Sequence, residues 1–140
     1  MEKDRGGKRK MAKKRLLITG ISGFIGEEIA QKAYNENYEV AGLIRQSFRY
    51  NEAIDNLKGK VKLYEGSLHD YARLVTIVRD FMPDYVAHLG AITPVSYSFD
   101  HPWEVTQTNY VGTINLTEAL KAFDPSLKQF VFASSMETYG

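Results

Sequence analysis

A glycine-rich turn between a short apolar run and an amphipathic segment constrains the fold of this chain more than any other feature. The run RLLIT at 15–19 has the length of a strand, and residues 24–37 carry apolar side chains at helical spacing. Between them, Gly20, Gly23 and Gly26 form a G-x-x-G-x-x-G pattern. In such a unit the first glycine permits a tight turn, the second lets the backbone approach a pyrophosphate, and the third lets helix and strand pack closely. The turn therefore predicts a dinucleotide site. A Walker A loop is excluded because no Gly-Lys-Ser/Thr follows.

The remainder of the chain alternates between strand-like and helix-like segments. After the first strand, further strands are predicted at 38–44, 61–66, 85–90 and 129–134. Helices are predicted at 24–37, around 51–57, from the N-cap Asp70 to just before Pro83, and at 103–123 after a loop with Pro94 and Pro102. The apolar stripe of the first helix is Phe24, Ile25, Ile29, Ala30 and Ala33. The alternation predicts a doubly wound α/β fold, whose parallel sheet is covered by helices on both faces.

The end of the second strand indicates which dinucleotide binds. About 20 residues after the glycine turn, an acidic residue would bond the ribose 2′-hydroxyl, whereas an arginine would accept a 2′-phosphate. This chain has Arg45 there, in LIRQS, and no acidic residue before Glu52. A guanidinium pairs with a phosphate through charge-assisted hydrogen bonds and cannot accept one from a hydroxyl. We therefore predict NADP, with NAD as the second choice. The alternative is that Arg45 only ends the strand and faces solvent.

Composition and charge limit the other functions of the chain. The 140 residues contain no cysteine and three separated histidines, which argues against a zinc site. Residues 1–15 hold 8 of the 18 basic residues and 2 acidic ones, so residues 16–140 carry 10 basic and 15 acidic residues, a net charge of −5. We expect a disordered basic tail at 1–14, one domain at 15–140, and no nucleic-acid partner. No run is long enough to cross a membrane and no secretion signal is present, so a cytoplasmic location is expected.

Four motifs in order resemble a known family. TGISGFIG, HLGA, NYVGTINLTEA and SSMETYG together resemble the extended short-chain dehydrogenase/reductases, which are NAD(P)-dependent sugar-nucleotide epimerases and dehydratases with a Rossmann fold. The resemblance implies that the pyrophosphate is lined by Gly20, Ser22, Gly23, Phe24 and Ile25. It also implies that Leu89, Gly90 and Ala91 pass beneath the adenosine half. Asn109, Gly112 and Thr113 match the long-helix motif of the family, in which the asparagine is mainly structural.

The third strand departs from the family pattern. The family usually has Gly-Asp-Leu after this strand, with the aspartate holding the adenine amino group. This chain has Gly66, Ser67 and Leu68. A serine hydroxyl can still form a hydrogen bond, so we expect weaker adenine recognition at an otherwise intact site.

Arg45 followed by Gln-Ser is most similar to the GDP-mannose 4,6-dehydratase type within the family. The NAD-using epimerases and dTDP-glucose dehydratases usually have an acidic residue at this position. The function implied is the cofactor-binding part of an NADP-dependent sugar-nucleotide 4,6-dehydratase with a nucleotide-sugar substrate. Another epimerase or reductase of the family is the alternative.

The motif SSMETYG would contribute the first catalytic groups. By resemblance, Ser135 hydrogen-bonds the sugar hydroxyl that is oxidised, and Glu137 removes the carbon 5 proton while water leaves carbon 6. Met136 stands where dTDP-glucose dehydratases have an aspartate, which argues against that subclass. Without the resemblance, Glu137 could equally be a polar loop residue.

The catalytic Tyr-x-x-x-Lys pair of the family does not occur in these 140 residues. We therefore expect the pair and the substrate-binding lobe to lie downstream of Gly140 in the full protein, which would be a homo-oligomer. The 140 residues alone are expected to bind a nucleotide without catalysing. A catalytically silent NADP-binding regulatory module is the other hypothesis from a different class.

Overall fold

The computed structural model describes residues 12–45 and 52–139. The predicted disordered tail at 1–14 lies outside the described residues except for its last three positions. Of these, Lys14 contacts the sheet, because its backbone oxygen accepts a hydrogen bond from the N–H of Glu39 at 2.9 Å. Its ammonium lies 5.6 Å from the centre of the Tyr38 ring. Lys14 therefore packs with the domain that follows it.

Five strands form one parallel sheet. They are β1 (Arg15–Thr19), β2 (Glu39–Ile44), β3 (Lys62–Glu65), β4 (Tyr85–His88) and β5 (Gln129–Phe132). Their order is β3-β2-β1-β4-β5, and every neighbouring pair is parallel. The prediction of a doubly wound parallel sheet is confirmed, although four of the strands are shorter than predicted. Because the chain winds outward from β1 in both directions, the sheet has a crevice between β1 and β4 at the carboxyl ends of the strands.

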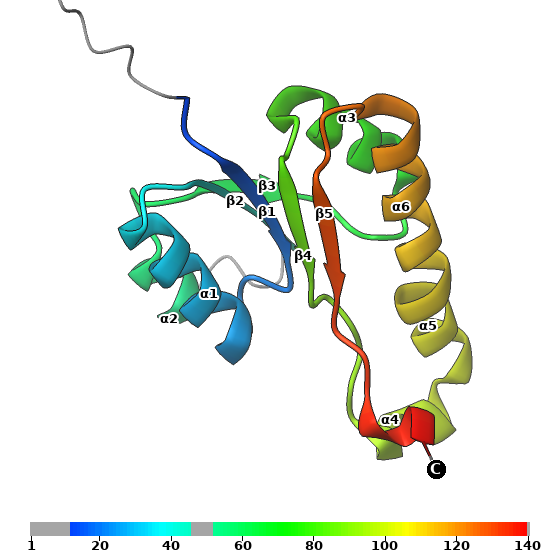
Figure 1. The fold of residues 1–140 in the computed structure, drawn as a ribbon. Helices are drawn as coiled ribbons and strands as arrows, with labels where there is room; N and C mark the ends of the chain where they lie inside the picture. The colour runs from blue at the N-terminus through cyan, green and yellow to red at the C-terminus, as the bar shows by residue number, and fades with distance from the viewer. Residues whose placement is uncertain (1–11, 46–51, 140) are drawn as a thin grey trace, which may run out of the picture.

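Helices cover both faces of the sheet (Figure 1). They are α1 (Phe24–Asn35), α2 (Glu52–Asn56), α3 (Tyr71–Phe81), α4 (Val95–Asp100), α5 (Pro102–Thr106) and α6 (Gly112–Phe123). One layer contains α1 and α2, and the other contains α3 and the rod formed by α5 and α6. A π-helical turn, η2 (Gln107–Val111), joins α5 to α6, and a 3₁₀ helix, η3 (Met136–Tyr139), ends the described chain.

Successive residues of the central strand enter opposite cores, as the alternation of side chains along a strand requires. Leu17 packs with Val86 and Leu116 on the α3/α6 face. Ile18 packs with Ala30 on the α1/α2 face. Both strand residues are essentially inaccessible, with 2% and 0% exposure. Burial on both faces is the reason why β1 is a continuous apolar run.

The segment before the last helix differs from the prediction. A loop with Pro94 and Pro102 was expected there, but Pro94 is the N-cap of α4 and Pro102 is the first residue of α5. Proline is compatible with a helix start because the first turn does not need its missing N–H. The predicted helix at 103–123 is also not a regular α-helix, because the π turn interrupts it.

The two helix predictions that named residues have different outcomes. Asp70 caps α3 as predicted, since its carboxylate accepts a hydrogen bond from the Arg73 N–H at 2.9 Å. In α1, however, Phe24 and Ile25 are 84% and 63% exposed, and the helix buries Gly26, Ala30 and Ala33 instead. The apolar stripe therefore faces the core over only part of its length, and Phe24 and Ile25, which the resemblance assigns to the pyrophosphate site, lie outside the core.

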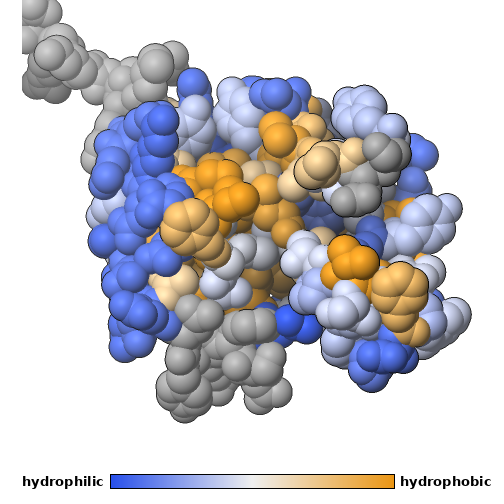
Figure 2. Space-filling model, turned by 90° about the horizontal axis from the view of Figure 1, so that it is seen from below, coloured by the Kyte–Doolittle hydropathy of each residue, from blue (hydrophilic) through white to orange (hydrophobic). Residues whose placement is uncertain are grey.

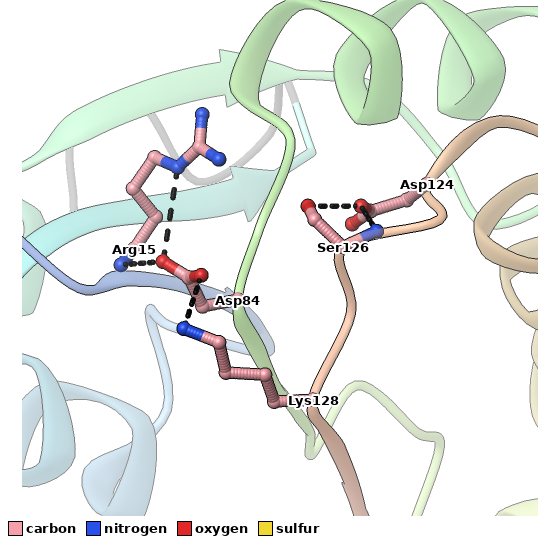
Figure 3. A network of polar contacts seen from close by, with 5 residues as sticks. All are labelled: Arg15, Asp84, Asp124, Ser126 and Lys128. Atoms are coloured by element: carbon pink, nitrogen blue, oxygen red, sulfur yellow. Dashed lines mark hydrogen bonds and ion pairs between the residues drawn. The ribbon is translucent and has the colours of Figure 1, made fainter.

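Asp84 ties together the amino ends of three strands (Figure 3). Its Oδ2 accepts a hydrogen bond from the backbone N–H of Arg15 at 2.8 Å, and Lys128 Nζ lies 2.9 Å from its Oδ1. These contacts lower the pKa of the Asp84 carboxyl, with the Arg15 N–H as the largest cause. In the same region, Asp124 Oδ1 accepts hydrogen bonds from the N–H and hydroxyl of Ser126.

Replacing Asp84 by alanine should lower the free energy of unfolding by about 1.5–3 kcal/mol, because a charge-assisted acceptor for a partly buried N–H is lost. A carboxyl whose pKa is depressed stabilises the fold above its ordinary value of 3.8 and loses this contribution as the pH falls. The difference between wild type and Asp84→Ala in urea unfolding should therefore shrink in acid. Glu118→Ala is the control, because Glu118 forms only an exposed pair with Lys121 at 3.7 Å in the part of the chain that the structure describes. An equal effect of both substitutions would contradict the prediction.

β5 is exposed on both of its faces. Val131 and Phe132 are 51% and 53% exposed, although they belong to a strand of a parallel sheet. Parallel sheets normally bury such side chains on both faces.

None of the helices that the structure describes has the length and hydrophobicity needed to cross a membrane.

Candidate cofactor-binding site

A cleft of about 660 Å³ lies at the carboxyl ends of the strands. Figure 2 looks onto this edge of the sheet and shows hydrophobic side chains gathered along a hollow. The walls come from the glycine turn after β1 and the segments that follow β2, β3, β4 and β5. The cleft includes the crevice between β1 and β4, where ligands bind in open α/β sheets.

The glycine turn leaves no space for side chains at two of its positions. A Cβ on Gly26 would lie 2.2 Å from the backbone oxygen of Gly20, so α1 begins in direct contact with the turn. Gly20 has a φ of +74°, and a Cβ there would lie 2.9 Å from the backbone nitrogen of Gly90. The turn therefore packs directly on the segment that follows β4.

The glycine at the start of α1 leaves that end of the helix open. Gly23 is the N-cap and has no side chain that could cap the helix. The first N–H groups of an α-helix have no partner within the helix and carry partial positive charge. This helix end borders the cleft, as required for a site that binds the pyrophosphate of a dinucleotide.

All residues predicted to bind the cofactor line this one cleft. They are Gly20, Ser22, Gly23, Phe24, Ile25, Arg45, Ser67, Leu68, Leu89, Gly90 and Ala91. They come from four separate segments of the chain, which the parallel sheet brings to the same edge. The exposure of Phe24 and Ile25 has its explanation here, because both side chains border the cleft instead of the core.

The cleft also contains residues that the sequence did not indicate. They include Thr19, Leu43, His69, Ile92, Glu104 and Thr108. His69 Nε2 lies 2.9 Å from Thr108 Oγ1, and this hydrogen bond joins the segment after β3 to the π turn. Glu104 and Thr108 belong to no motif that indicated the cofactor, and the packing of the helical rod against the sheet places them at the cleft.

The segment after β3 is anchored to α6. Asn115 Nδ2 donates a hydrogen bond to the backbone oxygen of Leu68 at 2.9 Å. Gly112 allows this approach, since a Cβ there would lie 2.7 Å from the Leu68 Cβ. The Ser67 hydroxyl accepts a hydrogen bond from the His69 N–H at 3.2 Å, and its own hydrogen can still be donated.

The segment 89–92, which forms a wall of the cleft, is held at two points. The Gly90 N–H donates to Thr19 Oγ1 at 3.0 Å. The Asn109 amide bonds both backbone groups of Ile92, accepting from its N–H at 2.8 Å and donating to its oxygen at 2.9 Å. This bidentate contact agrees with the structural role expected for Asn109.

His88 ends β4 directly behind this wall and is 2% exposed. Its Nδ1 lies 2.6 Å from Thr19 Oγ1, and its Nε2 lies 2.9 Å from Thr113 Oγ1. Burial lowers the pKa of His88 from 6.5 to about 4, because the charged imidazolium would lose its hydration. His88 is therefore neutral at physiological pH.

We expect His88 to make the fold less stable between pH 6.5 and about 4. In this window the unfolded chain binds a proton at His88 and the folded chain does not, so stability decreases as the pH falls. The gap between the two pKa values corresponds to about 3 kcal/mol at its full extent. Urea unfolding at a series of pH values measures this loss of unfolding free energy. His88→Asn is the comparison, because the part of the loss that comes from protonation of His88 should be missing from its pH profile. An unchanged profile would contradict the prediction.

Arg45 lies directly after β2 and lines the cleft, as does Glu104 of α5. The Tyr97 hydroxyl donates a hydrogen bond to Glu104 Oε2 at 2.6 Å. This bond raises the pKa of Tyr97, and the positive charge of Arg45 partly opposes the rise. Glu104 of the cleft wall and Tyr97 therefore form a hydrogen-bonded pair on which the charge of Arg45 acts. The Gln46–Ser47 pair that follows Arg45 lies outside the described residues.

Of the two predicted catalytic residues, Ser135 follows the cleft wall and is not among the described residues that line it. Ala133 and Ser134, which follow β5, reach the cleft wall. Ser135 is the next residue, and its backbone oxygen accepts a hydrogen bond from the Thr138 N–H at 3.2 Å. Glu137 belongs to η3, and its side chain lies outside the described part of the structure.

Comparisons with known proteins agree with this architecture. The family described as GDP-mannose 4,6 dehydratase matches residues 17–140. The GDP-mannose 4,6-dehydratase of Vibrio cholerae serotype O1 is 35% identical over 139 residues, covering 93% of this chain and 37% of the relative. The GDP-mannose 4,6 dehydratase of Cricetulus griseus is 36% identical over 148 residues, covering 98% and 38%.

A solved structure shows the same fold. The UDP-glucose 4-epimerase of Thermus thermophilus in complex with NAD has a TM-score of 0.77 and 30% identity to this chain, over 86% of this chain and 37% of the epimerase. The chain thus spans less than half the length of these relatives. Its parallel sheet, its glycine turn and the match over nearly all of its length show that the chain belongs to the GDP-mannose 4,6-dehydratase family of the extended short-chain dehydrogenase/reductases.

Proposed function

We propose that this chain is the cofactor-binding part of an NADP-dependent sugar-nucleotide 4,6-dehydratase of the GDP-mannose type, with residues 15–140 as the nucleotide-binding domain. The observation that carries the proposal is the convergence of the predicted residues on one cleft beside the open end of α1. The family supports a nucleotide-sugar substrate, and the cleft supports a dinucleotide.

Arg45 supports NADP as the cofactor. It lines the cleft at the end of β2, where the adenosine ribose of a dinucleotide would lie in a Rossmann fold. A 2′-phosphate there would form charge-assisted hydrogen bonds with the guanidinium. The competing proposal is NAD, which is favoured by the NAD complex of the epimerase with the same fold.

The residues after β5 are proposed to act on the sugar. When bound, the cofactor would accept a hydride from carbon 4 of the hexose and return one to carbon 6. Ser135 would hold the carbon 4 hydroxyl, because a serine both donates and accepts hydrogen bonds. Glu137 would remove the carbon 5 proton, which is acidic while carbon 4 is a ketone, as water leaves carbon 6.

Binding of the cofactor can be tested on this chain directly. We expect isothermal titration calorimetry to show one site for NADP⁺, with NAD⁺ binding about tenfold or more weakly, because NAD⁺ lacks the charge-assisted bonds to Arg45. Tighter binding of NAD⁺ would replace NADP in the proposal. Binding of neither would contradict it.

The reaction is tested on the full protein that contains this chain. Incubation with GDP-mannose should give a 4-keto-6-deoxy sugar nucleotide, detected by mass spectrometry as the loss of one water. UDP-glucose should remain unchanged. Conversion of UDP-glucose to UDP-galactose would instead establish the epimerase alternative, and binding of NADP without any turnover would establish the regulatory module.

A further inference from the structure

A chain of hydrogen bonds runs behind the cleft wall from the segment after β4, through β1 and the end of β4, to the π turn. It contains, in order, the Gly90 N–H, Thr19 Oγ1, the His88 ring, Thr113 Oγ1 and the backbone oxygen of Asn109. The four distances are 3.0, 2.6, 2.9 and 2.7 Å. Thr19 and His88 are 1% and 2% exposed, so water does not replace these partners easily.

The two ends of this hydrogen-bond series determine which group donates in each of its bonds. The Asn109 carbonyl can only accept, so the single hydroxyl hydrogen of Thr113 is donated to it. His88 Nε2 must then carry a hydrogen and donate it to Thr113 Oγ1. A neutral imidazole has one N–H, so His88 Nδ1 accepts, and the Thr19 hydroxyl donates to it.

The opposite tautomer satisfies fewer groups. With the hydrogen on Nδ1, His88 Nε2 and the Asn109 carbonyl would compete for the one hydrogen of Thr113. Thr19 Oγ1 would accept from both Gly90 and His88, and its own hydrogen would lose its acceptor. Because unpaired polar groups are costly in a buried region, the tautomer with Nε2–H is favoured.

The chain of bonds connects the two anchors of the segment 89–92. Thr19 holds Gly90 at one end, and the Asn109 side chain holds Ile92 at the other. His88 lies between them, through Thr19 on one side and Thr113 on the other. The rings of Phe130 and Phe132 lie 5.8 and 5.7 Å from the His88 ring and enclose it from β5.

We propose that His88, as the Nε2–H tautomer, is a positioning residue that sets the segment 89–92 against the glycine turn. Its effect on dinucleotide affinity rests on the function proposed above. The contact it preserves is close, because a Cβ on Gly20 would lie 2.9 Å from the Gly90 nitrogen. A shift of Gly90 would move the cleft wall directly beside the turn.

The tautomer is tested without any nucleotide. In a ¹⁵N spectrum of the histidine-labelled chain at neutral pH, His88 should show a pyrrole-type shift for Nε2 and a pyridine-type shift for Nδ1. The reverse pattern, or rapid exchange between the two tautomers, would overturn the proposal whether or not the chain binds a dinucleotide.

The positioning role is tested with Thr113→Val, which removes the hydroxyl and keeps the side-chain shape. Thr113 is not among the residues that line the cleft in the described part of the chain. Hydrogen exchange of the Gly90 and Ile92 amides should become about tenfold faster, because the loss of one hydrogen bond lowers the free energy of local opening. The NADP⁺ dissociation constant should rise by a similar factor. Thr113→Ser should restore both values because it keeps the hydroxyl.

Thr117→Val is the matched control. Thr117 lies one turn further along α6, and its hydroxyl donates to the backbone oxygens of Thr113 and Ile114, which belong to the same helix. It should change neither the exchange of Gly90 and Ile92 nor the affinity. Equal effects of Thr113→Val and Thr117→Val would show that His88 contributes only to the general stability of the fold, and would overturn the proposal. If wild type binds no dinucleotide, the proposed function fails, while the tautomer and the exchange rates still decide the role of His88.

Discussion

Gly26→Ala should lower the free energy of unfolding of this chain by about 3 kcal/mol, the upper end of the usual cost of overpacking, because the site is rigid. The new Cβ would lie 2.2 Å from the Gly20 oxygen and 2.7 Å from the Ile21 Cα. Both atoms belong to the backbone, so the strain cannot be relieved by a side-chain rotation. The helix or the turn would have to move. Urea unfolding, monitored by circular dichroism, measures this loss of stability. The loss is a large share of the unfolding free energy of a typical domain, which is about 5–15 kcal/mol.

Gly23→Ala is the matched control in the same turn. Its Cβ would meet only the Gly20 oxygen, at 3.3 Å, among the described residues, and its φ of −85° suits any residue. We expect a stability loss below about 1 kcal/mol. The dissociation constant for NADP⁺ should nevertheless rise about tenfold or more, because a methyl group would stand where the pyrophosphate approaches the backbone. Equal unfolding of both variants would contradict the roles assigned to the two glycines.

Arg45→Ala should weaken NADP⁺ binding by about 10- to 100-fold and leave NAD⁺ binding within about twofold. Charge-assisted hydrogen bonds to a phosphate contribute about 1.5–3 kcal/mol, and only NADP⁺ carries the 2′-phosphate. Titration calorimetry of the variant with both dinucleotides measures the change in preference.

Arg79→Ala is the control for the loss of one positive charge. Arg79 is exposed on the last turn of α3, near the Phe123 ring, and is not among the described residues that line the cleft. It should leave the ratio of the two affinities unchanged. Equal weakening of NAD⁺ and NADP⁺ by Arg45→Ala would show that the guanidinium does not recognise the 2′-phosphate.

The order of elements could be predicted because local patterns determine it. The predicted strands are short segments of strand-like composition, and the capping of α3 by Asp70 needs only residues close in sequence. The cofactor residues were predictable for a different reason. The carboxyl ends of parallel strands meet at one edge, so the positions after β1, β2, β3 and β4 had to lie together.

The prediction failed where two interpretations of one residue type compete. Proline occurs in loops and also at the starts of helices. Here Pro94 and Pro102 stand at the starts of α4 and α5. For Phe24 and Ile25 the helical stripe and the family resemblance indicated different surroundings; α1 approaches the sheet through Gly26 and small alanines, which leaves both side chains at the cleft, as the resemblance implied. Helical periodicity finds an apolar stripe but does not show which part of it the sheet covers.

By itself, the amino-acid sequence determined the parallel α/β architecture, the glycine turn and the set of segments that meet at the cleft. These features depend on local periodicity, on the absence of a Cβ and on the geometry of parallel strands. Only the tertiary structure decided that Thr19, His88, Thr113 and Asn109 form one chain of hydrogen bonds and that His69 and Thr108 join two cleft walls. The physical reason is that all of these bonds except Thr113–Asn109 join residues distant in sequence, which meet only through the pairing of β1 with β4 or through the packing of the α5–α6 rod on the sheet.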